Sequence, residues 1–97
     1  MTTDKLKSLC SLYLEKLDGI CPEIAPRQMT GEQAREVAHH LSSRDRIAHY
    51  KFMCVQSSIF ADAGQVEKAM RWLGFLQGVL WRRNLFTLAE LKEQASS

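Results

Sequence analysis

Apolar residues recur every three or four positions along most of the chain, which is the spacing that places side chains on one face of an α-helix. The sequence lacks the alternating β-branched positions that indicate a strand. Both prolines, Pro22 and Pro26, lie between residues 19 and 29, so we expect a long loop there. The pattern predicts an all-α fold, a small helical bundle in which residues 1–97 form one domain.

Five segments combine helical periodicity with capping signals. The predicted helices cover residues 4–18, 31–41, 43–63 and 66–83, and a short one covers 87–93. Thr3 is expected to cap the first helix, while Gly19 and Gly64 are expected to end the first and the third. Capping boxes, in which two residues satisfy each other's free N–H groups at a helix start, are predicted for Thr30 with Gln33, Ser42 with Asp45, and Thr87 with Glu90. Residues 95–97 are expected to fray.

The helix predicted over 43–63 is apolar on two sides, as expected for a central helix with a neighbour on each side. One apolar arc consists of Ile47, Tyr50, Cys54 and Ala61, and the other of Ala48, Phe52, Val55, Ile59 and Ala63. Because only Gly64 and Gln65 separate this helix from the next, we expect a central antiparallel hairpin with short flanking helices. Its core is expected to include Phe52, Val55, Ile59, Leu73, Leu76 and Leu80.

Two glycines, Gly74 and Gly78, lie four residues apart inside the helix predicted over 66–83. Each glycine inside a helix costs about 1 kcal/mol relative to alanine, so we expect the close approach of another body to offset this cost. With Arg71 and Arg82, they lie on the arc opposite the apolar stripe of the helix. We interpret this arc as a docking face. The alternative is that another helix of the same chain packs against the glycines.

Two further residues near the end of this helix, Trp81 and Arg83, extend the hypothesis. Tryptophan and arginine dominate binding hot spots, which favours Trp81, Arg82 and Arg83 as contacts. Trp81 fits a core position equally well, and the arginines also complement the helix macrodipole. The candidate partner-binding residues are Arg71, Gly74, Gly78, Trp81, Arg82 and Arg83.

Composition indicates the cellular compartment of the protein but not its activity. The chain has 97 residues and a net charge of +2, which is too small an excess to indicate nucleic acid or an anionic membrane on its own. Its three cysteines are scattered, which argues against a disulfide framework and fits a reducing cytosol. No signal peptide or membrane-spanning run is evident. We therefore expect a cytoplasmic protein without membrane contact, and a homo-oligomer stays an open alternative.

No motif indicates a catalytic, cofactor or metal site. The adjacent His39 and His40 point about 100° apart on a helix, so they cannot chelate one ion together. Cys54 and His49 lie on different faces of the predicted helix, without an evident orienting acid. We expect a protein that is not an enzyme and holds neither metal nor cofactor.

Nucleic-acid or nucleotide binding is the competing class. Residues 31–51 loosely imitate a helix-turn-helix, with Arg44, Arg46 and Lys51 as candidate contacts. A second basic set on the next helix consists of Lys68, Arg71, Arg82 and Arg83. Phosphate-driven binding weakens steeply as salt rises, whereas an apolar interface does not.

A family resemblance is carried by two runs of the sequence, EKAMRWLGFLQGVLW at 67–81 and FTLAELK at 86–92. They resemble the C-terminal part of short proteins encoded by tailed bacteriophages and prophages, which also carry a helix start matched here by Ser43-Arg44-Asp45. The likeness covers residues 42–93. Short phage proteins outside the virion often bind and redirect a host protein. The resemblance therefore implies a non-enzymatic protein–protein interaction protein, a phage-encoded inhibitor or adaptor acting on a host or phage protein.

Overall fold

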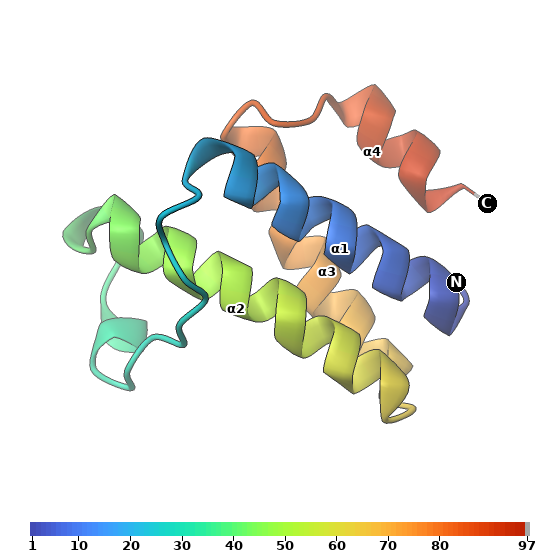
Figure 1. Ribbon diagram of the computed structural model, residues 1–97, viewed down its shortest axis with the longest axis horizontal. Helices are drawn as coiled ribbons and strands as arrows, with labels where there is room; N and C mark the ends of the chain where they lie inside the picture. Colours follow the sequence, from blue (N-terminus) through green and yellow to red (C-terminus); the bar gives the residue numbers. More distant parts are fainter. Residues whose placement is uncertain (97) are drawn as a thin grey trace.

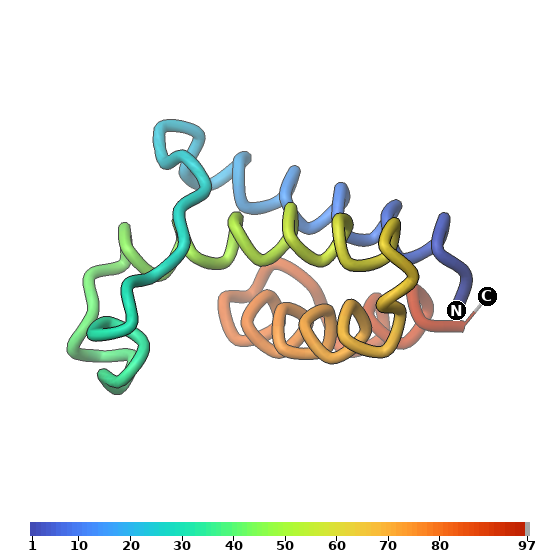
Figure 2. Tube along the Cα trace, turned by 90° about the horizontal axis from the view of Figure 1, so that it is seen from below, coloured from blue at the N-terminus to red at the C-terminus, as the bar shows by residue number. Residues whose placement is uncertain are grey.

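Three long helices in two layers form the body of the protein in the computed structural model, which describes residues 1–96. Helices α1 (Thr3–Ile20) and α2 (Ser43–Asp62) lie antiparallel, and α3 (Val66–Arg82) forms the second layer (Figure 1, Figure 2). The short α4 (Leu88–Ala95) ends close to the N-terminus. At the opposite end, the connection between α1 and α2 projects outward and contains two 3₁₀ turns, η1 (Gln33–Arg35) and η2 (Ala38–His40). Residues 1–96 contain no strand, which confirms the all-α helical bundle.

The core lies between the two layers. Its buried apolar side chains are Leu6, Leu9, Cys10, Tyr13 and Leu17 of α1, Met53, Cys54 and Ala61 of α2, Ala69, Leu73, Leu76 and Leu80 of α3, and Phe86. In α1 and α3 these residues recur at three- and four-residue spacing, so each helix turns one stripe inward. The Tyr13 hydroxyl donates a hydrogen bond to Gln94 Oε1 at 2.7 Å and thereby ties α4 to α1.

The predicted hairpin of α2 and α3 is confirmed. Gly64 turns the chain in the left-handed region, with a φ of 81°, which glycine adopts at little cost. The N–H of Gln65 then donates to the carbonyl of Phe60 at 2.9 Å, which closes the turn. The helix predicted over 66–83 is observed as Val66–Arg82, one residue shorter at its C-terminal end.

The second apolar arc predicted for α2 is a core surface only in part, because Ala48 is buried and Phe52 packs against the core while Ala63 is exposed. Val55 and Ile59 are 40% and 52% exposed, so they do not belong to the predicted core of the hairpin. On this arc, Ala48 packs with the loop residue Ile24, and the ring centre of Phe52 lies 6.4 Å from that of Trp72 in α3. The rest of the arc stays open to solvent.

Helix α1 is longer than predicted at both ends. Thr2, rather than Thr3, is its N-cap, and its hydroxyl accepts a hydrogen bond from the N–H of Lys5 at 3.1 Å. Gly19 lies inside the helix, which continues to Ile20. Cys21, the C-cap, is outside the helical region because the residue that precedes a proline is disfavoured there, so the helix ends at Ile20. At the other end of the chain, Ala95 is the last residue of α4, and Ser97 lies outside the described residues.

The α-helix predicted over 31–41 is wrong. The capping pair is formed, since Thr30 Oγ1 and Gln33 Oε1 accept from each other's N–H at 3.1 and 3.0 Å. However, the chain leaves the helical region at Glu36, and neither 3₁₀ turn contains a buried residue. A segment without an apolar face to bury lacks the tertiary packing that stabilises a short helix.

Lys51, predicted as a candidate nucleic-acid contact, is wholly buried. Its ammonium group donates to the carbonyls of Cys21 and Ile24 at 2.6 and 2.7 Å, and it forms an ion pair with Asp18 at 2.7 Å. It therefore fixes the start of the loop against α2. Burial of Ile24 against Ile47 completes this attachment.

Candidate functional site

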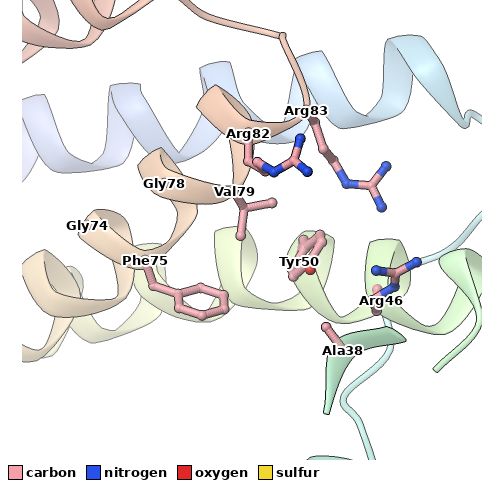
Figure 3. Close-up of a pocket in the computed structure, with 9 residues that line it drawn as sticks. All are labelled: Ala38, Arg46, Tyr50, Gly74, Phe75, Gly78, Val79, Arg82 and Arg83. Atoms are coloured by element: carbon pink, nitrogen blue, oxygen red, sulfur yellow. The ribbon is translucent and has the colours of Figure 1, made fainter. Parts of the chain in front are cut away.

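An open groove lies along α3, on the side away from α1. It is lined by Ala38, Arg46, Tyr50, Gly74, Phe75, Gly78, Val79, Arg82 and Arg83, which come from η2, α2, α3 and the residue that follows α3 (Figure 3). Its volume is about 660 Å³. The arrangement depends on the hairpin, because α2 and α3 each present one wall.

The floor of the groove is bare backbone. Gly74 and Gly78 are both exposed, and a Cβ added to either would meet nothing within 4 Å in residues 1–96 beyond α3's own backbone. The alternative that another helix of the same chain fills this space is therefore wrong. The cost of the two glycines to the helix is not offset by any contact within residues 1–96.

One end of the groove is cationic. Figure 3 shows the guanidinium groups of Arg46 and Arg83 on the side of Tyr50 away from Phe75, and that of Arg82 between Val79 and Tyr50. The Arg83 guanidinium carbon lies 5.9 Å from the centre of the Tyr50 ring, within cation–π range. Arg46 Nη2 donates to Ser43 Oγ at 3.2 Å, while Arg46 Nε is buried without a hydrogen-bond partner in the described chain. None of the Asp and Glu residues within 1–96 lines the groove.

The other end of the groove is apolar. Phe75 is 54% exposed beside Gly74, and its ring centre lies 6.2 Å from that of Tyr50. A second hollow of about 330 Å³ adjoins this end and shares Ala38, Arg46, Tyr50 and Phe75 with the groove. It continues beneath the 3₁₀ segment to Met29, Gln33, Ala34, Glu36, Leu41 and His49, so among the described residues its one carboxylate is that of Glu36. The groove thus extends from the three arginines to the aromatic side chains of Tyr50 and Phe75.

The loop that carries the two 3₁₀ turns, and with them Ala38 of the groove lining, is held to α2 by polar contacts. The N–H of Met29 donates to His49 Nδ1 at 3.1 Å, so this ring nitrogen carries no proton. Asp45 pairs with Arg27 and accepts from Gln33 Nε2 at 3.2 Å. The same carboxylate therefore does not return to Ser42, and only half of the predicted Ser42–Asp45 capping box is formed. Burial lowers the pKa of His49 below its usual value.

The structure brings together four of the six predicted partner-binding residues, Gly74, Gly78, Arg82 and Arg83. Arg71 instead lines a separate hollow at the start of α3, next to Gly64. Trp81 is 47% exposed and lies beside the turn into α4, so its interpretation as a core residue is wrong and it does not line the groove.

Arg46, Tyr50 and Phe75 were not predicted to join the glycines. The angular position of Phe75 around the α3 helix is enough to place it beside the glycines. The two α2 residues belong to the groove because of how α2 packs against α3, which no local pattern encodes.

Two of the three thiols, those of Cys10 and Cys54, are buried in the core. Burial raises the pKa of Cys10 to about 11 and that of Cys54 to about 12, so both are protonated, and weakly nucleophilic, near neutral pH. Residues 1–96 contain no group of three metal-binding side chains within reach of one ion.

Two further observations bear on the class of protein. No helix of the described chain is both long enough and apolar enough to cross a lipid bilayer. Comparisons with protein-family models, curated proteins and solved structures give no match.

Proposed function

We propose that the protein is a non-enzymatic interaction protein that docks a host or phage protein in the α3 groove. In the phage context that the sequence resemblance implies, it acts in the bacterial cytoplasm as an inhibitor or adaptor. The mechanism is occlusion or recruitment through a preformed helical surface, because the groove is already open in the free chain.

The observation that carries this proposal is the pair of uncovered glycines. Gly74 and Gly78 weaken α3, and no atom of residues 1–96 uses the space they leave. A body from outside the chain is the remaining source of a compensating contact. Exposed Phe75 beside them adds apolar surface of the kind that protein interfaces bury.

The chemistry of the lining also supports binding rather than a reaction. Among the described residues that line the groove there is no carboxylate, histidine, cysteine or serine, which are the usual general bases and nucleophiles. Arginine, tyrosine and phenylalanine are residues that recognise a surface.

The second candidate function is a nucleic-acid- or nucleotide-binding accessory role. The three arginines at one end of the groove favour it, since guanidinium groups bind phosphate as well as carboxylate. In that case affinity falls linearly with the logarithm of salt concentration.

Affinity capture from a bacterial lysate, with and without nuclease treatment, tests the proposal. Gly78→Leu fills the groove floor, whereas Gly19→Leu adds the same side chain to another helical, exposed glycine that meets nothing within 4 Å in the described chain. We expect the wild type and Gly19→Leu to retain a specific protein and Gly78→Leu to lose it while remaining folded. Equal capture by all three, or capture that nuclease abolishes, would overturn the proposal.

A further inference from the structure

We propose that the occupant of the groove is an acidic α-helix of the partner protein, with carboxylates at the arginine end and small or apolar side chains over the glycines. This inference rests on the proposed function and names the chemistry of the partner. It follows from the division of the groove into a cationic end and an apolar end (Figure 3).

The arginine end has unused hydrogen-bonding capacity. Arg82 and Arg83 take part in none of the ion pairs formed within residues 1–96, and Arg46 Nε is buried without an acceptor. That atom is enclosed by the chain itself, so the donors that a partner can reach are the N–H groups of Arg82 and Arg83. Each guanidinium group also presents a planar fork that fits a carboxylate with two parallel hydrogen bonds.

The glycine end fits a helix. Gly74 and Gly78 are four residues apart, so they interrupt one ridge of side chains on α3 and leave a shallow channel along its axis. Two helices normally pack 8–10 Å apart, depending on the side chains at the contact. Without side chains at these two positions, the partner helix reaches the short end of that range. Phe75 and Val79 then flank it with apolar contacts.

The charge distribution disfavours the two other occupants. A second copy of the chain docked through the same face would bring no carboxylate to the arginines, because no Asp or Glu of residues 1–96 lines the groove. A nucleic-acid strand needs cations along its track, but within residues 1–96 the groove is lined by three basic residues alone, Arg46, Arg82 and Arg83, and Arg71 lines a different hollow. The net charge of the chain is only +2.

Site-specific photo-cross-linking identifies the occupant directly. Phe75→p-benzoylphenylalanine keeps an aromatic ring at the apolar end and links to whatever lies over it upon irradiation in a bacterial lysate. We expect the linked peptide, identified by mass spectrometry, to have helical periodicity and at least two Asp or Glu residues within about two helical turns. Adding Gly78→Leu should abolish the link, whereas adding Gly19→Leu should not.

The outcomes separate this inference from the proposed function. A linked protein segment without carboxylates overturns the acidic helix and leaves docking in the groove intact. A link to a second copy of the chain likewise overturns it. A link to nucleic acid, or no macromolecule linked at all, overturns both.

Charge removal provides an independent measurement on the linked segment, prepared as a synthetic peptide. The double variant Arg82→Gln, Arg83→Gln should bind it about tenfold or more weakly, since each lost charge-assisted hydrogen bond is significant. Arg44→Gln, at an exposed arginine outside the groove, is the matched control and should bind as the wild type does. Equal affinity for all three proteins would contradict the proposed contacts.

Discussion

Lys51 is a basic residue whose role the sequence pattern does not indicate. A lysine in a helical pattern is normally interpreted as exposed to solvent. Lys51 is instead wholly buried, donates hydrogen bonds to two backbone carbonyls and forms an ion pair with Asp18. The partners lie 27 to 33 positions away or are backbone groups of an irregular loop, so no local spacing reveals them. Burial of such a charge is tolerated because its donors are satisfied.

Replacing Lys51 by Met tests this attachment. The change leaves the carbonyls of Cys21 and Ile24 without their donor, so we expect the free energy of unfolding to fall by about 1–3 kcal/mol. Urea denaturation followed by circular dichroism measures it. Lys92→Met, at an exposed lysine of α4, should change it by less than about 0.5 kcal/mol. Equal effects of the two changes would place Lys51 on the surface.

His49 predicts a pH dependence of stability. Burial lowers its pKa in the folded state below the usual 6.5, so the unfolded chain binds the proton more readily. The stability that neutral His49 contributes is complete above about pH 6.5 and is lost as the pH falls below that value. Protonation also removes the acceptor for the N–H of Met29.

The test compares denaturation midpoints of the wild type and His49→Gln between pH 7.5 and 5. We expect the wild type to lose stability over this range more steeply than the variant. Parallel curves for the two proteins would show that His49 is not the group that titrates.

At the scale of the element, periodicity and caps predicted the four α-helices well: α1 and α3 each have one apolar stripe, α4 has a capping box, and the Ser42 hydroxyl caps α2. The reciprocal bonds of Thr87 and Glu90 are an example. The segment 31–41 has a formed capping pair but no buried face, and it folds as two 3₁₀ turns. A cap therefore marks where a helix can begin, while burial decides whether it continues.

Leu76 and Ile59 provide the corresponding prediction for the hairpin. Leu76 is completely buried in α3, so Leu76→Ala should lower the free energy of unfolding by about 2–5 kcal/mol. Ile59 is half exposed on α2, and Ile59→Ala should lower it by no more than about 0.5 kcal/mol. Chemical denaturation of the two variants measures both. A larger loss at Ile59 would mean that the open side of α2 is covered.

At the scale of the whole molecule, the groove is assembled from segments that are far apart in the sequence. Gly74, Gly78 and the arginines that follow them were predictable, because one helix carries them at helical spacing. Arg46 and Ala38 reach the same groove only through the packing of α2 on α3 and the attachment of the 3₁₀ wall. Such long-range placement is set by the core, which sequence periodicity describes one helix at a time.

The free energy of unfolding of the double variant Gly74→Ala, Gly78→Ala tests the central claim, that the glycine face is open in the monomer and kept for a partner. Alanine fits both positions without contact, so the open groove predicts that stability rises by about 1–2 kcal/mol. Gly19→Ala, at another uncovered helical glycine, calibrates the gain for one such site. A fall in the stability of the double variant would contradict the claim, because it would show that part of the chain itself packs against these glycines.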